Sequence, residues 1–156
     1  MTIDTEPVID LNTDDTTKDQ YLTFEIDSEE YGVSISDIKE IISVCPITLV
    51  PQTPEYVKGI INLRGDVIPV IDVRKRFGKP PKEYDSQTCI VVVEHSIYTI
   101  GLIVDNVKEV MYIDSTNVLP PPSAKLNHYN QFVRNIGRVG DGVKLLLDLE
   151  KFLNQS

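Results

Sequence analysis

Hydrophobic and polar residues alternate one by one along much of the chain after residue 20, which is the pattern of half-buried β-strands. In the first such stretch, Leu22, Phe24 and Ile26 alternate with polar neighbours. A stretch near residue 100 repeats this pattern, and a short polar break separates each stretch from a second strand-like segment. The pattern therefore predicts two β-hairpins, formed by residues 20–27 with 30–35 and by residues 87–94 with 97–104.

The segment from Lys58 to Gly78 predicts a further hairpin followed by a helical turn. Two runs rich in β-branched residues, 59–63 and 67–71, flank Arg64-Gly65-Asp66, and glycine followed by aspartate is typical of a tight turn. Pro69 lies inside the second run. Because proline cannot donate a ladder hydrogen bond, that strand is expected at a sheet edge or a bulge. Arg64 is therefore expected at a hairpin tip that a partner protein can reach.

A short helix is predicted over Asp37–Ile42, because Ser36 can cap its first turn. Three isoleucines recur at a spacing of three residues, at Ile35, Ile38 and Ile41. This spacing is suited to apolar anchors that contact a partner helix, and it is equally suited to the buried face of a helix. The pattern alone leaves both interpretations open.

The order of these elements repeats weakly along the chain. One predicted hairpin is followed by Ile38-Lys39-Glu40-Ile41, and another by Val107-Lys108-Glu109-Val110. Asp72 and Asp148 each follow a strand end, where an aspartate can cap the next helix. The repeat predicts two strand-rich lobes of similar plan, with chance similarity between hairpins as the alternative.

The composition indicates a globular domain, because 41% of the 156 residues are apolar, enough to close a core without disulfides or metal. The formal net charge is -9, and residues 1–19 hold six acidic residues against one lysine and no aromatic residue. We therefore expect residues 1–19 to be a disordered acidic tail. The acidic balance also disfavours nucleic acid and anionic membranes as partners.

The sequence offers no convergent set of groups for catalysis. His95 and His128 lack neighbours that would make either a general base or a metal ligand, and Cys45 and Cys89 lack the spacing of a zinc site. Neither a phosphate loop nor a dinucleotide-binding motif occurs. The longest aliphatic run is far shorter than the ~20 residues that cross a bilayer. We expect no enzymatic activity, no cofactor, no metal, no membrane insertion and a cytoplasmic location.

Residues 59–77 resemble the core signature of the chemotaxis coupling protein (CheW) family, G-x-x-N-L-R-G-x-x-x-P-V-x-D-h-R-x-x-F, with h an apolar residue. The residues that match are Gly59, Asn62, Leu63, Arg64, Gly65, Pro69, Val70, Asp72, Val73, Arg74 and Phe77. Upstream, Glu30-Tyr31-Gly32-Val33 and the Ile38-Lys39-Glu40-Ile41 segment resemble the family's first hairpin and the element after it. The resemblance runs from about Gln20 to the C-terminus.

The resemblance implies an all-β fold of two five-stranded SH3-like β-barrel subdomains packed side by side. A third apolar core would lie between them, with short helices and a C-terminal helix near residues 149–153. The CheW-like domain would then cover residues 20–156. One lobe is expected at about residues 20–85 and the other at about residues 86–156, and an exchange of strands between the lobes is left open.

The resemblance also implies a function: a non-catalytic adaptor that couples chemoreceptors to a CheA-type histidine kinase in bacterial chemotaxis. Its partners would be the kinase regulatory domain and the cytoplasmic tip of the receptors, and it would be recruited from the cytoplasm to membrane-associated receptor arrays. The receptor-binding positions that it implies are Ile38, Glu40, Gly59, Asn62 and Arg64. Residues that face the kinase stay unassigned. On the residues alone, a pairing of Arg64 with Glu40 is an ordinary surface ion pair.

Three alternatives are distinguishable by experiment. A coupling protein of a related chemosensory pathway would serve a different output, such as surface motility or pili. A small-molecule-sensing barrel would need a concave apolar pocket with converging polar groups. An oligonucleotide-binding barrel would bind in a salt-sensitive manner, which the acidic balance disfavours.

Overall fold

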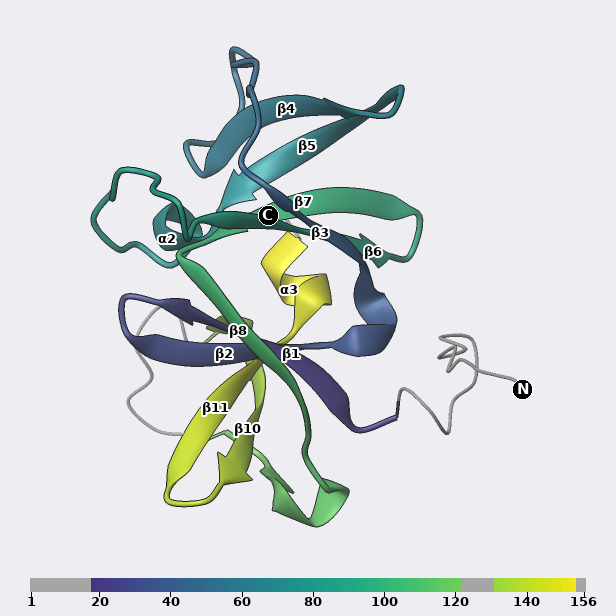
Figure 1. Ribbon diagram of the computed structural model, residues 1–156, viewed down its shortest axis with the longest axis vertical. Helices are drawn as coiled ribbons and strands as arrows, with labels where there is room; N and C mark the ends of the chain where they lie inside the picture. Colours follow the sequence, from purple (N-terminus) through teal and green to yellow (C-terminus); the bar gives the residue numbers. More distant parts are fainter. Residues whose placement is uncertain (1–17, 122–130, 154–156) are drawn as a thin grey trace.

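The computed structural model describes residues 18–121 and 131–153, which form two β-sheets with short helices between and beside them (Figure 1). Residues 1–17 of the expected acidic tail, as well as His128, lie outside this part of the chain. The first sheet has the order β8 (Asn106–Tyr112), β1 (Gln20–Ile26), β2 (Glu29–Ser34), β11 (Gly142–Leu147), β10 (Val133–Val139) and β9 (Val118–Leu119). The second has the order β3 (Ile38–Ser43), β6 (Cys89–His95), β7 (Tyr98–Val104), β5 (Asp66–Asp72) and β4 (Val57–Leu63).

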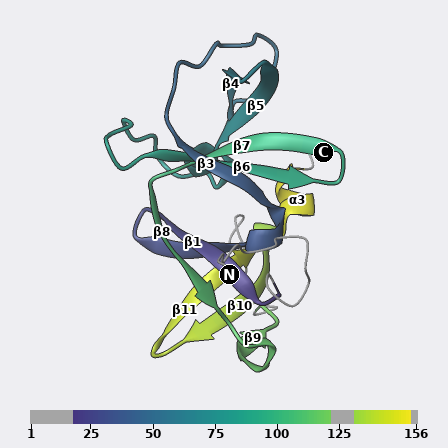
Figure 2. The ribbon, with the colours of Figure 1, turned by 45° about the vertical axis from the view of Figure 1, so that its right-hand side comes forward.

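The two sheets share one plan of strand connections. After hairpin β1–β2 the chain crosses to the other sheet, where β3 pairs with β6. After hairpin β6–β7 it crosses back, and β8 pairs with β1 (Figure 2). Later hairpins join through parallel pairs, β5 with β7 and β11 with β2. The mostly β architecture is confirmed, although the first sheet has six strands where five were expected.

Each sheet draws strands from both sequence segments that were expected as lobes. Strands β3 and β5 come from residues 20–85 and pair with β6 and β7, which come from residues 86–156. Strand β8 likewise belongs to the later segment and joins the sheet of β1 and β2. The sheets are therefore interleaved in sequence. The SH3-like character of each lobe stays a prediction.

The largest buried cluster lies between the sheets and holds them together. It combines Phe24 and Tyr31 of the first sheet with Val91 and Leu102 of the second. The Phe77 ring is tilted against the Tyr31 ring, with centroids 5.0 Å apart, and it meets Phe152 edge-on, so aromatic rings bridge the two layers. A second cluster fills the interior beside the second sheet, with members Ile61, Ile68, Val70, Ile90, Val92 and Ile103. Burial of this apolar surface is the main stabilising contribution to such a fold.

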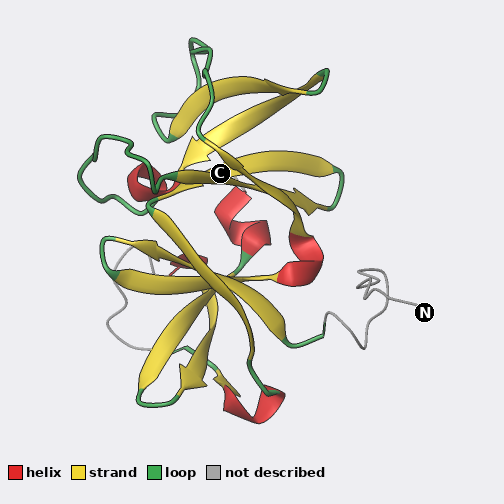
Figure 3. Cartoon of the chain, in the orientation of Figure 1, coloured by secondary structure: helices red, strands yellow, loops and turns green. Residues whose placement is uncertain are grey.

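The helical segments are short (Figure 3). They include the 3-10 turns η2 (Ile35–Asp37) and η3 (Ser115–Asn117), and the α-helices α2 (Val73–Arg76) and α3 (Leu149–Leu153). The expected C-terminal helix is confirmed as α3, and Asp72 caps α2 by accepting a hydrogen bond from the Lys75 backbone N–H. None of the helices in the described residues has the length and apolar character needed to cross a membrane.

The helix predicted over Asp37–Ile42 is wrong. The helical turn covers only Ile35–Asp37, with Ser34 in place of Ser36 as its cap, and the next six residues form β3. Burial alternates along β3, as in a strand with one face inward. The buried strand β6 offers an edge for pairing, and β-branched isoleucines favour that pleated surface. The spacing of the isoleucines is compatible with a helix or with a strand, and pairing with β6 selects the strand.

Candidate partner-binding groove

The β4–β5 turn holds Arg64 outward, as the sequence predicted. Arg64 and Gly65 both have positive φ, at 52° and 92°, which is the backbone of a tight hairpin turn. The Asn62 side-chain oxygen accepts a hydrogen bond of 2.8 Å from the Gly65 N–H, so Asn62 braces the turn from within. The tip is therefore a preformed platform for the Arg64 side chain.

Gly59 lies deeper in the same hairpin and lets another segment pass close to β4. A Cβ at this position would come within 2.2 Å of the Thr48 carbonyl oxygen. Thr48 and Ile60 exchange two backbone hydrogen bonds at 2.8 and 2.9 Å, which depend on this approach. Gly59 is buried, so it supports the hairpin rather than exposing a contact surface.

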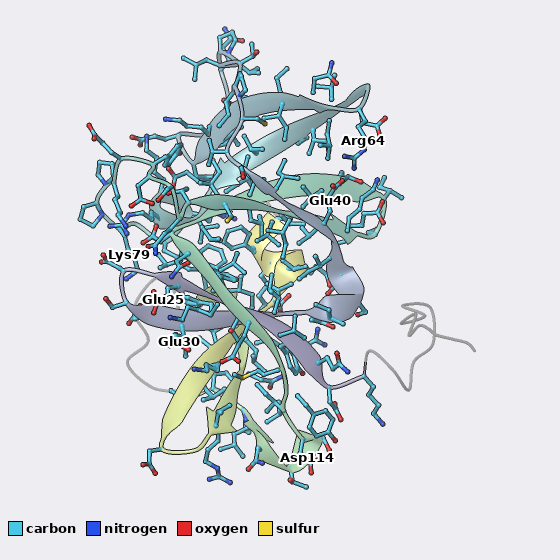
Figure 4. All side chains as sticks on the ribbon, in the orientation of Figure 1. Glu25, Glu30, Glu40, Arg64, Lys79 and Asp114 are labelled. Carbon is cyan, nitrogen blue, oxygen red and sulfur yellow. The ribbon has the colours of Figure 1, made fainter. Side chains whose placement is uncertain are left out.

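The structure brings Arg64 and Glu40 together (Figure 4). An Arg64 guanidinium nitrogen donates to a Glu40 carboxylate oxygen, linking the hairpin tip to strand β3. The Arg64 side chain is 68% exposed and the Glu40 side chain 24% exposed. A pair this open to solvent contributes only about 0 to 1 kcal/mol to stability. It keeps the charges of the two side chains at the protein surface.

The three isoleucines do not share one face, because β3 is a strand. Ile35 and Ile38 are half-buried and pack against the cluster between the sheets. Ile41 points to the opposite side of β3 and is 43% exposed. On β3, Ile38 pairs with Val93, which lies close to the end of β6. Of the predicted receptor-binding residues, Ile38 and Glu40 therefore lie on β3, while the others belong to the β4–β5 hairpin.

Next to this end of β6 lies a groove that the sequence did not reveal. It has a volume of about 720 Å³ and is lined by residues of the second sheet, of the β6–β7 turn and of α3. The residues that line this groove are Pro69, His95, Ser96, Tyr98, Ile100, Glu150 and Leu153. Ile97, at the β6–β7 turn beside it, is 87% exposed. In the sequence, the only sign of this groove was an isoleucine within a predicted turn. That sign becomes informative only when the structure shows which residues of the second sheet and α3 lie next to the turn.

A smaller and more polar hollow adjoins the groove and shares His95 with it. Its polar lining includes Asp37 of η2 and Arg134 of β10. Burial of the carboxyl raises the pKa of Asp37 above its ordinary value of 3.8, and the nearby His95 and Arg134 oppose that shift. The hollow therefore places polar and titratable groups of both sheets at one end of the apolar groove.

Candidate metal ligands are scattered over the described residues. In residues 18–121 and 131–153, no cluster of three or more His, Cys, Asp or Glu side chains is placed to hold a metal ion. Cys45 and Cys89 are free thiols, and burial raises the pKa of Cys89, which lowers its reactivity. His95, expected to be an ordinary surface histidine, lines both hollows.

Comparisons with known proteins agree with this fold. The family model of the CheW-like domain matches residues 20–156. The chemotaxis protein CheW of Klebsiella aerogenes is 30% identical over 140 residues, which cover 90% of this chain and 84% of the relative. The chemotaxis protein CheW of Helicobacter pylori is 35% identical over 136 residues, which cover 87% and 82%.

A solved structure gives the same result in three dimensions. The crystal structure of the scaffolding protein TtCheW from Thermoanaerobacter tengcongensis superposes with a TM-score of 0.78 at 38% sequence identity, covering 83% of this chain and 88% of that one. Sequence and fold therefore match over most of the chain. The chain belongs to the CheW-like domain family of chemotaxis scaffold proteins.

Proposed function

We propose that this protein is a non-catalytic adaptor that couples chemoreceptors to a CheA-type histidine kinase in bacterial chemotaxis. One observation carries the proposal: an apolar groove lies between the second sheet and α3, and a preformed hairpin tip of that same sheet carries an exposed Arg64 that pairs with Glu40. Membership of a family of chemotaxis scaffolds supports the pathway. The groove is the surface that we assign to the receptor.

A receptor tip is a helical hairpin, and a helix that docks in a groove needs apolar anchors inside a polar rim. Tyr98, Ile100 and Leu153 offer apolar surface in the groove. Arg64 and Glu40 offer charges on the side of the molecule that holds η2 and the β6–β7 turn (Figure 4). A guanidinium has five N–H donors, so an arginine that already pairs with one carboxylate can still bind a partner's carboxylate.

The kinase would bind elsewhere on this adaptor. Its regulatory domain has the same fold in the family that this chain resembles, so pseudo-symmetric contacts between the ends of the sheets would join the two proteins. Contacts of this heterologous type close into rings or propagate into arrays. The adaptor would work in the cytoplasm and be recruited to receptor arrays at the membrane. The residues that face the kinase are left unassigned.

A reconstituted assay with receptor, kinase and adaptor tests the proposal. We expect Arg64→Ala to leave the fold intact and to reduce receptor-dependent kinase activity. Arg138→Ala is the matched control, because Arg138 is an exposed arginine of β10 whose hydrogen-bond acceptor is Asn117. Activation by folded Arg64→Ala equal to that by the wild-type protein would contradict the role of the tip. Failure of the wild-type protein to support activation would contradict the adaptor function itself.

The pathway served is a separate question that capture from the native cell answers. Receptors and kinase of the flagellar chemotaxis system are expected among the captured proteins. Recovery of the components of a surface-motility or pilus system would instead identify a related chemosensory pathway.

A further inference from the structure

Helix α3 forms one wall of the groove, through Glu150 and Leu153. The helix has only five residues, and a helix this short is not stable without external contacts. Leu149 and Phe152 are buried beneath it and provide part of that support. Burial fixes the helix to the core, but it does not by itself fix where the end of the helix lies against the second sheet.

A second contact holds the end of α3, and it comes from Arg76 at the end of α2. The Arg76 Nε donates a hydrogen bond of 3.0 Å to the Phe152 backbone oxygen. The last carbonyls of a helix have no partner within the helix, so this bond satisfies one of them. Because α2 follows β5 and α3 follows β11, the contact joins the two sheets.

Aromatic rings surround the same guanidinium. It lies 4.2 Å from the ring centroid of Tyr56, 4.6 Å from that of Phe132 and 5.9 Å from that of Phe152. Tyr56 precedes β4 of the second sheet, whereas Phe132 precedes β10 of the first. A cation held over several ring faces is attracted electrostatically to each of them. The guanidinium is thus placed between elements of both sheets and against the groove wall.

We infer that Arg76 is a positioning residue for the partner groove: with Tyr56 it holds the end of α3 and so sets where Leu153 and Glu150 meet the docked helix. The inference rests on the proposed function, because it assigns the groove to the receptor. Arg76 is not among the groove-lining residues, so its effect on binding is exerted through α3. The chemistry requires arginine, because a planar guanidinium stacks on rings while donating through Nε.

Hydrogen exchange and binding together test this inference on the full chain with Arg76→Lys, which keeps the charge. We expect faster exchange at the amides of residues 149–153. We also expect affinity for a receptor-tip helical hairpin, measured by calorimetry, to fall roughly threefold to tenfold, because a lysine ammonium cannot stack flat on the rings while it donates to the Phe152 carbonyl oxygen. Affinity for the kinase regulatory domain should stay at the wild-type value. A general loss of folding would instead lower the affinities for receptor and kinase together.

Three further variants serve as controls. Tyr56→Phe keeps the ring beneath the guanidinium and should match the wild type, whereas Tyr56→Leu removes it and should behave like Arg76→Lys. The Tyr56→Leu result decides the question if Arg76→Lys fails to fold. Arg138→Lys changes an exposed arginine away from α3 and should leave exchange and affinity unchanged.

Two outcomes would overturn the inference. One is unchanged exchange in α3 together with wild-type receptor affinity in Arg76→Lys. The other is an equal loss of affinity for receptor and kinase, which would indicate a purely structural role. If the wild-type chain binds no receptor hairpin while exchange in α3 still rises in Arg76→Lys, the proposed function fails but the contact that holds α3 stands.

Discussion

Two arginines ten residues apart form ion pairs in very different surroundings. Arg64, at the β4–β5 tip, has a side chain that is 68% exposed and pairs with Glu40. Arg74, in α2, has a side chain that is only 8% exposed. The difference shows that burial, rather than residue type or the presence of a carboxylate, determines what an ion pair does in this protein.

Arg74 is surrounded by acceptors from three parts of the chain. Its guanidinium donates to Asp105 at 2.7 Å, to Asp27 at 3.2 Å and to the Pro80 carbonyl oxygen at 2.8 Å. Asp105 also accepts a hydrogen bond from the Asp27 backbone N–H, so the two aspartates are linked directly. Asp27 lies in the β1–β2 turn and Asp105 at the crossing from β7 to β8. The Arg74 network therefore holds the two sheets together, whereas the Arg64 pair lies at the surface.

The largest effect on stability is expected for Arg74→Ala. Removing the guanidinium leaves the half-buried Asp105 without its cation, and breaking a buried pair in this way costs about 3 to 5 kcal/mol. Urea unfolding should show this loss. Lys108→Ala, which removes an exposed pair with Glu25, is the control and should change stability by less than about 1 kcal/mol. Similar losses in the two variants would end the distinction between buried and exposed pairs.

A smaller loss is expected for Gly59→Ala, which tests what holds the hairpin that carries Arg64. The new methyl group would meet the Thr48 carbonyl oxygen at 2.2 Å, so the backbone must shift. Overpacking of this kind costs about 1 to 3 kcal/mol. Thermal unfolding measures the loss. Gly65→Ala is the contrast, because both glycines have a positive φ, at 155° and 92°, but a Cβ at Gly65 would meet no atom within 4 Å. If Gly59→Ala were as stable as the wild type, the close approach would not support the tip.

For Arg64→Ala we expect a change in the free energy of unfolding below about 1 kcal/mol, because the pair with Glu40 is exposed. Receptor-dependent kinase activity should nevertheless fall. Urea titration and the reconstituted kinase assay measure the two effects on one protein sample. A loss of stability as large as that of Arg74→Ala would mean that the exposed Arg64 pair stabilises the fold as strongly as the buried Arg74 network, and would contradict the comparison.

The smallest effect is expected for Asp37→Asn and depends on pH. Because burial raises the pKa of Asp37 in the folded state, its contribution to stability is fully present below the ordinary aspartate pKa and is lost as pH rises through the folded pKa. Asparagine removes the charged form, so the variant should unfold at a slightly higher temperature than the wild type at neutral pH and should show no such gain in acid. Thermal unfolding at the two pH values measures this difference. A lower unfolding temperature at neutral pH would mean that His95 and Arg134 outweigh the burial.

Local features of this fold could be predicted from the sequence. The hairpin turn at Arg64-Gly65-Asp66 and the cap at Asp72 follow from backbone preferences and short-range hydrogen bonds, which neighbouring residues determine. The alternation of apolar residues likewise predicted β1 and β7. Glu40 was the candidate partner for an arginine at the hairpin tip, and the structure contains this pair.

Features that depend on long-range pairing could not be predicted. An isoleucine spacing of three is compatible with a helix or a strand, and only pairing with β6 makes residues 38–43 a strand. The groove arises where β6, β7 and α3 meet, although α3 is about fifty residues beyond β7 in sequence. The contacts of Arg76 with Phe132 and Phe152 likewise join distant segments. In each case the decisive neighbour is absent from the local sequence.

A charge exchange at the tip tests the central claim most directly, using calorimetric titration of a receptor-tip hairpin into the folded double variant Glu40→Arg with Arg64→Glu. The exchange keeps an ion pair between β3 and the hairpin tip but reverses which strand carries the cation. If Arg64 recognises the receptor, the double variant stays folded and its affinity remains reduced, like that of Arg64→Ala. Recovery of wild-type affinity would show that the pair only braces the hairpin, and would contradict the account.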